Sequence, residues 1–234
     1  MKKLAILLVT SVVLSGITNA QEKKEYPNVH GVTSGEFIFS GGDVEIDGVN
    51  QDMGMRFSFF FHYGQYWHID LNNNFGFYSG GAIRNVGLKT KNEGDYDKII
   101  RRSYSLGIPV AVKLGSFKDH FFVFGGAEGE WMFHYKQKFF NDDGKQKSSE
   151  WFSDRVNPIM PSVFAGIQFP KGLNLKFKYY LNDFLNKEYR GSDFGTTVDY
   201  SIYKTQMFYI SISFDIETKD LLNKKKDSVL ASRK

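Results

Sequence analysis

The stretch SYSLGIPVAVKL, residues 103–114, decides the fold. Apolar residues occupy every second position, and serine, glycine, proline, alanine or lysine lies between them. A β-strand turns successive side chains to opposite faces, so a period of two indicates a strand with one apolar face. The same alternation returns in residues 52–63, 67–77 and 208–216. The chain is therefore predicted to be all-β.

Alternating connection lengths predict how the strands are joined. Residues 64–66, 115–120 and 170–172 are short and carry turn residues. Between them lie the long polar segments 41–51, 91–98, 141–157 and 186–200. Short turns at one end and long loops at the other are typical of outer-membrane barrels. We predict an eight-stranded up-and-down antiparallel transmembrane β-barrel over residues 34–217, with strands at 34–40, 52–63, 67–90, 99–114, 121–140, 159–169, 173–186 and 201–216.

The amino-terminal residues have the pattern of an export signal. Lys2 and Lys3 precede a short apolar run, and Ala20 follows small residues, which is the pattern of a signal peptide cleaved after Ala20. Residues 21–33 are expected to form a periplasmic segment, and residues 218–234 a basic periplasmic tail. The formal charge of +4 falls to +2 when Lys2 and Lys3 leave, so nucleic acid is not an expected partner. With no cysteine, the chain has neither disulfides nor thiolate metal sites.

Alternation alone does not separate a membrane barrel from a soluble lipocalin-type barrel, which turns its apolar face inward. Two features favour the membrane barrel. Glycines recur in mid-strand on the polar face, where a crowded interior needs small residues. The same face carries charges of both signs, which we predict to form a structural network in the lumen: Arg56, Asp70, Arg101, Lys113, Glu128, Glu130, Lys176, Lys178 and Asp215.

Aromatic residues supply a third feature. They gather where the strands should cross the two membrane interfaces, as the aromatic girdles of outer-membrane barrels do. The predicted interface aromatics are Tyr63, Tyr66, Trp67, Phe121, Trp131, Phe133, Tyr135, Phe169, Tyr179 and Tyr203.

Three stretches carry a resemblance to a known family. They are FGFYSGGAIRNVG at 75–87, SLGIPVAVK at 105–113 and FGGA at 124–127. Together they resemble the outer-membrane β-barrel domain family abundant in Bacteroidota, often called porin-family proteins, a broad group that includes the PorT-like secretion component. The resemblance implies an outer-membrane barrel over nearly the whole mature chain. Barrels usually end on a terminal aromatic, whereas here about twenty residues follow Phe214.

From its sequence motifs, the chain is predicted to have no catalytic, cofactor or metal site. Neither a His-x-Ser signature nor a G-x-S-x-G turn is present. His62 and His68 are expected to face each other across the 64–66 turn, without a third metal ligand. Asp142 and its neighbours lack the remaining ligands of a calcium loop. Glu128 and Glu130 share one face, opposite Gly107 and Ser105, and are expected to pair with lumen cations rather than act as acid and base.

The sequence therefore predicts a non-enzymatic integral outer-membrane protein with a side-chain-filled lumen. An eight-stranded barrel leaves no aqueous channel, which argues against a general diffusion porin. Its expected partners are outer-membrane lipid and envelope proteins that contact the loops 41–51, 91–98, 141–157 and 186–200. Two alternatives remain open: a lipid-modifying enzyme, and a soluble periplasmic lipocalin-like carrier of an apolar ligand.

Overall fold

Buried and exposed side chains alternate along most of the strands, as the period-two sequence pattern predicts. The computed structural model describes residues 26–142, 144–194 and 196–219. Within β7 (Tyr96–Ser116), Ser103, Ser105 and Gly107 are buried while Leu106 and Ile108 are exposed. The expected signal peptide and nearly all of the basic tail lie outside the described residues, so both stay predictions.

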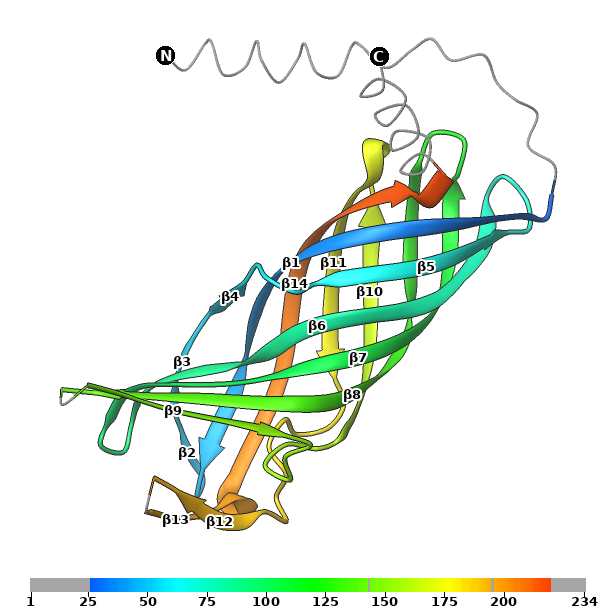
Figure 1. Cartoon of the computed structure of the whole chain (residues 1–234). Coiled ribbons are helices and arrows are strands. Elements are labelled where there is room, and N and C mark those ends of the chain that lie inside the picture. Colours follow the sequence, from blue (N-terminus) through cyan, green and yellow to red (C-terminus); the bar gives the residue numbers. More distant parts are fainter. Residues whose placement is uncertain (1–25, 143, 195, 220–234) are drawn as a thin grey trace, which may run out of the picture.

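The strands close into a ring. In order around the barrel, β1, β5, β6, β7, β8, β10, β11 and β14 pair as antiparallel neighbours, and β14 pairs back to β1 (Figure 1). This confirms the predicted eight-stranded antiparallel barrel. The ring strands are β1 (Asn28–Ile46), β5 (Tyr63–Asp70), β6 (Phe75–Glu93), β7, β8 (Phe121–Asn141), β10 (Ile159–Gln168), β11 (Leu173–Tyr180) and β14 (Tyr203–Glu217).

The predicted second strand, residues 52–63, is broken into short strands, and the predicted turn at 64–66 is wrong. Gly64 lies inside β5, between Ser34 and Ala82. The turn lies instead after Leu71, where the Asn72 side-chain oxygen accepts hydrogen bonds from the backbone N–H of Asn74 (2.8 Å) and Phe75 (2.9 Å). An asparagine that caps its own turn in this way tightens the hairpin. The prediction that His62 and His68 face each other across a turn at 64–66 is therefore wrong.

Three short strands precede β5 in the chain and extend this side of the barrel toward its other end. They are β2 (Val49–Asn50), β3 (Asp52–Gly54) and β4 (Arg56–Ser58). β3 pairs with β6, whereas β4 pairs with β1. Beside β4, side chains bond the β6 backbone: Arg56 donates to the Asn85 carbonyl (3.1 Å), and the Asn85 N–H donates to His62 Nδ1 (3.3 Å). Residues 59–62 thus interrupt the backbone pairing next to β6, and hydrogen bonds from polar side chains replace part of it.

The expected long loops are mostly hairpins. β1 begins at Asn28 rather than at residue 34 and continues through most of 41–51, and β6 and β7 meet at Gly94 and Asp95. Segment 141–157 contains β9 (Gly144–Trp151), and segment 186–200 contains β12 (Arg190–Asp193) and β13 (Thr196–Asp199), followed by the short helix η2 (Tyr200–Ile202). These hairpins lie at the end of the barrel opposite to Asn28 and Glu217 (Figure 1). The short helix η1 (Pro170–Gly172) joins β10 to β11 at the other end.

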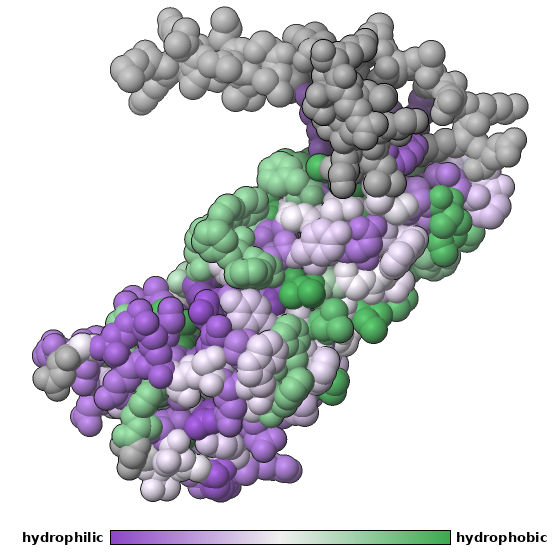
Figure 2. All heavy atoms as spheres, viewed as in Figure 1, coloured by the Kyte–Doolittle hydropathy of each residue, from purple (hydrophilic) through white to green (hydrophobic). Residues whose placement is uncertain are grey.

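Apolar side chains cover the outside of the barrel. Ile108 is 61% exposed and Val110 62%. Figure 2 shows apolar residues over the middle of the barrel and hydrophilic residues over its hairpin end. None of the helices in the described part of the chain is long and apolar enough to cross a membrane. A wall with its apolar side chains outward and its charges inward is the arrangement of a membrane barrel rather than of a soluble one.

Candidate functional site: a charged lumen

The centre of the lumen holds six charged side chains in mutual contact. Arg84, on β6, is the hub, and it donates through Nε to Glu36 (2.8 Å). One of its Nη atoms donates to Glu128, and the other donates to the Tyr66 hydroxyl (3.1 Å). Lys178 lies between Glu128 (2.6 Å) and Glu130, and Lys176 contacts Glu36 (2.7 Å).

These six charges balance, since Arg84, Lys176 and Lys178 face three carboxylates. The Glu130 carboxylate also accepts hydrogen bonds from two hydroxyls, that of Ser105 at 2.7 Å and that of Tyr180 at 3.1 Å. Charges in a low-dielectric interior are tolerated when they are paired and hydrogen-bonded in this way. The cluster therefore fills the lumen with ion pairs that leave little room for water.

Gly107 makes space for this cluster. A Cβ atom at that position would lie 2.0 Å from the Glu128 carboxylate oxygen. Gly107 pairs with Glu130, and Glu128 pairs with Pro109, so the expected register is wrong by two residues. A glycine in mid-strand is otherwise unfavourable, and here it allows the carboxylate to reach Arg84.

Most of the other predicted lumen charges lie apart from this centre. Asp70 contacts Lys113 (2.5 Å), and Lys113 also approaches His68 Nδ1 (3.0 Å). Arg56 bonds the Asn85 side chain (2.6 Å). Asp215 lines a pocket of about 30 Å³ together with Glu36 and Lys176. A pocket of that size holds a water molecule or two and no substrate.

Arg101 belongs to a separate cluster at the hairpin end. It donates to both oxygens of Glu93, at 2.7 and 2.5 Å, and the hydroxyls of Thr90 and Tyr203 also donate to Glu93. Burial alone would raise the pKa of the Glu93 carboxyl, but the Arg101 guanidinium and these hydrogen bonds hold it below its usual value. The Glu93 carboxyl is therefore an anion at neutral pH.

The hairpin end of the lumen is also closed. An apolar cluster that includes Phe184, Leu185 and Tyr200 fills the mouth of the barrel. Asp193, on β12, ties the mouth together by accepting from Gln137 (2.7 Å) and from Arg155 (3.0 Å). Within the described residues no group of three or more His, Asp or Glu side chains is placed to hold a metal ion.

Three charged residues of the two lumen clusters were not predicted: Arg84 and its partner Glu36 at the centre, and Glu93 beside Arg101. Glu36 alternates with Phe37, and Arg84 alternates with Ile83, so the period-two pattern contained a signal for both. Glu93 lies in β6, but it falls within the predicted loop 91–98, where the period-two pattern was not applied.

The predicted interface aromatics divide into two groups. Six lie at exposed or partly exposed positions on the outer surface: Tyr63, Trp67, Phe121, Trp131, Phe169 and Tyr179. Three predictions are wrong. Tyr66 and Tyr203 share the inward face of their strands with His68 and Met207. A bulge at Phe133 reverses the alternation in β8, so Tyr135 is buried. Phe133, the tenth residue, is itself partly exposed and stacks on Trp151.

An apolar exterior around a charged, side-chain-filled interior defines a membrane-spanning β-barrel. The chain is similar in fold to solved barrels. Neisserial surface protein A is 10% identical with a TM-score of 0.41, over 81% of this chain and 99% of that one. Ail of Yersinia pestis, in complex with the heparin analogue sucrose octasulfate, is 13% identical with a TM-score of 0.37, over 80% and 99%.

A third similar structure is the outer membrane protein OprG from Pseudomonas aeruginosa, at 13% identity and a TM-score of 0.36, over 80% of this chain and 95% of that one. No family model matches the chain, and no curated protein matches it in sequence. The protein's place in a membrane follows from its own exterior and interior.

Proposed function

We propose that this chain is a non-enzymatic integral outer-membrane protein with a sealed lumen, acting through its hairpin end. The observation that carries the proposal is the balanced cluster around Arg84, which crosses the lumen from β1, β6, β8 and β11. Displacing these side chains to admit solutes would break ion pairs that have no alternative partners in a membrane interior. The hairpins, in contrast, extend into water and are free to meet a partner.

A conductance measurement tests the sealed lumen. The full chain, folded in detergent and shown to be folded by heat-modifiable gel mobility, is added to a planar bilayer. We expect no stable conductance steps, because the Arg84 cluster and the apolar mouth both block the path. Removing the mouth contacts with Asp193→Ala is the matched variant, and it should also stay closed at the Arg84 cluster. Stable steps from the unmodified chain would refute a sealed barrel.

The geometry of the lumen argues against the two alternative functions, a lipid-modifying enzyme and a carrier of an apolar ligand. Glu128 and Glu130 both contact Lys178, so neither is free to exchange protons with a substrate. A carrier of an apolar ligand needs an apolar cavity, whereas this lumen is charged. We therefore favour a protein that presents surfaces over one that transforms or carries a ligand.

We infer further that the hairpin end faces outside the cell, where envelope proteins can contact it. Both described ends of the chain, at Tyr26 and Lys219, lie at the opposite end, which supports a periplasmic location for the termini (Figure 1). An epitope inserted at Gly144 should be labelled on intact cells. Labelling that requires permeabilised cells would mean the reverse orientation.

Export and family membership complete the proposal. The amino-terminal pattern supports a signal peptide cleaved after Ala20, and the stretches 75–87, 105–113 and 124–127 support membership of the Bacteroidota outer-membrane barrel family. Amino-terminal sequencing of the protein from the outer-membrane fraction should begin at Gln21. A sequence that begins at Met1 would contradict cleavage.

A further inference from the structure

The outer surface of β6, β7, β8 and β9 carries an ordered array of cations beyond the aromatic positions. Residues opposite each other on antiparallel strands share a face. One row contains Arg102 and Lys136, the next Lys89, Lys138 and Lys147, and the third Lys98 and Lys145. These seven residues are called the outer basic face: Lys89, Lys98, Arg102, Lys136, Lys138, Lys145 and Lys147.

The outer basic face is not neutralised by carboxylates of the described residues. Across residues 26–142, 144–194 and 196–219, no ion pair joins any of its seven cations to an acid, and the neighbouring Lys91 is the one that meets Asp52 (3.9 Å). Lys98 and Lys145 lie instead over the Phe140 ring, at 4.0 and 5.3 Å. Burial, and then four surrounding cations, lower the pKa of Lys138. Such crowding of like charge favours an anionic ligand.

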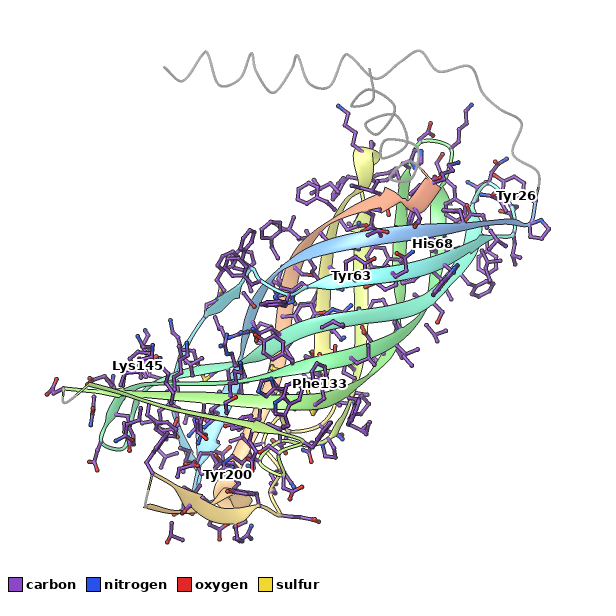
Figure 3. All side chains as sticks on the ribbon, viewed as in Figure 1. Tyr26, Tyr63, His68, Phe133, Lys145 and Tyr200 are labelled. Atoms are coloured by element: carbon purple, nitrogen blue, oxygen red, sulfur yellow. The ribbon has the colours of Figure 1, made fainter. Side chains whose placement is uncertain are left out.

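The aromatic residues beside the outer basic face indicate at which level of the membrane it lies. Directly next to the Arg102 row, Tyr104, His134 and Trp151 form a stack across three strands, with 5.6 Å and 4.0 Å between ring centroids. Trp131 stacks on Phe152 beside them. Aromatic residues of this kind lie at the level of the lipid headgroups. Figure 3 shows Phe133 nearer the middle of the barrel and Lys145 farther out along the same hairpin.

The spacing of the rows places the cations among headgroups. Successive rows are two residues apart, or about 7 Å along a strand. At a tilt of about 40° each row rises about 5 Å along the membrane normal. The polar headgroup layer is about 5–8 Å thick on each side of the hydrocarbon. The Arg102 row and the Lys138 row therefore lie at or just above the headgroups, with their side chains pointing toward lipid rather than into the lumen.

We propose that the outer basic face binds the phosphate groups of an anionic lipid in the outer leaflet. The inference rests on the proposed insertion into an outer membrane. A lipid is favoured over a soluble polyanion because the face continues without a break from the apolar surface and its aromatic stack. Acyl chains can lie against Ile108 and Val110, while the phosphates meet Arg102, Lys136, Lys138 and Lys147. Each of these cations then gains a phosphate oxygen.

The test uses the full chain folded in dodecylmaltoside micelles and a fluorescent diphosphoryl lipid A, with the dephosphorylated lipid as the second probe. The variant is Lys138→Gln/Lys147→Gln, a directly opposed pair. The matched control is Lys118→Gln/Lys171→Gln, which removes the same charge at the opposite end. Each juxtamembrane cation contributes roughly fivefold to binding at an anionic surface. Anisotropy should therefore show affinity for the phosphorylated lipid falling at least about tenfold in the variant.

The control should bind the phosphorylated lipid as the unmodified chain does, and the dephosphorylated lipid should bind weakly to every form. Equal affinity of the unmodified chain for both lipids, or unchanged affinity in the variant, would overturn the proposal. Inositol hexakisphosphate that binds the face as tightly without lipid would identify a soluble polyanion site and also overturn it. Heat-modifiable mobility reports insertion separately, so a failure of the proposed function would show as loss of the folded form in detergent.

Discussion

The cations of the central lumen cluster and those of the outer basic face occupy opposite surroundings. Arg84 touches three carboxylates, counting Glu130 at 3.5 Å, within a sealed interior. Arg102 and Lys136 lie on the same barrel wall, point outward and meet no carboxylate within the described residues. Buried charge demands a partner from the same chain, because water is absent. Charge at a membrane surface can be left for a ligand to neutralise. The first group should thus govern stability, and the second should govern binding.

The largest expected effect is the loss of the lumen hub. Arg84→Met leaves Glu36 and Glu128 without their shared cation, and breaking a buried pair in this way costs about 3–5 kcal/mol. Urea unfolding in detergent, followed by tryptophan fluorescence, should show this loss. Ile108→Val on the lipid-facing surface is the control and should change stability by less than about 1.5 kcal/mol. A variant at Arg84 as stable as the parent would mean that the cluster does not hold the barrel together.

A smaller effect measures the coupling within the cluster. Glu130→Gln and Lys178→Met should each destabilise the barrel, and the double variant should lose less than the sum, with a coupling of about 1–3 kcal/mol. The same cycle on Glu45 and Lys204, an exposed pair at 3.0 Å, is the control. Exposed pairs couple by about 1 kcal/mol or less. Additive losses at Glu130 and Lys178 would show that the two charges act independently.

Acid should weaken the Glu93 cluster. Because the folded-state pKa of Glu93 lies below its ordinary value of 4.5, the carboxylate contributes stability above about pH 4.5. That contribution is lost as the pH falls through the folded-state pKa, where the acid becomes protonated. Glu93→Gln should therefore be less stable than the parent at pH 7, and the two should converge at an acid pH below the folded-state pKa of Glu93. Glu188→Gln, at an exposed position, should follow the parent at both pH values. A constant gap at Glu93 would contradict this explanation.

The sequence predicts those features of the barrel that depend only on the local alternation of apolar and polar residues. Alternation identified the strands and placed Glu128 and Lys178 on the inward face because it follows from the pleat alone. It failed at Tyr135, since the bulge at Phe133 adds one residue and reverses the faces without any clear sequence mark. It also failed at Gly64, because a glycine within a strand resembles one in a turn.

The contacts that matter most depend on the closure of the ring. Arg84 meets Glu36 and Glu128 because the stagger of the barrel brings β1 and β8 to the same height as β6. That stagger is set by all eight strands together. The sequence could therefore indicate that Glu128 and Glu130 pair with lumen cations such as Arg56, Arg101, Lys176 or Lys178. Lys178 contacts both carboxylates, whereas Arg56 and Arg101 lie elsewhere. Arg84, the remaining partner, was not predicted.

The smallest expected effect provides the sharpest test of the comparison. Lys138→Gln/Lys147→Gln removes two cations that repel each other and have no carboxylate partner within the described residues. Substitutions at such surface positions change stability by about 0.5 kcal/mol or less, and relief of repulsion should make the sign favourable. Urea unfolding should thus be unchanged in the variant that loses lipid affinity. A marked destabilisation would show that the outer basic face supports the fold, as the lumen does, and the division between stability inside and binding outside would fail.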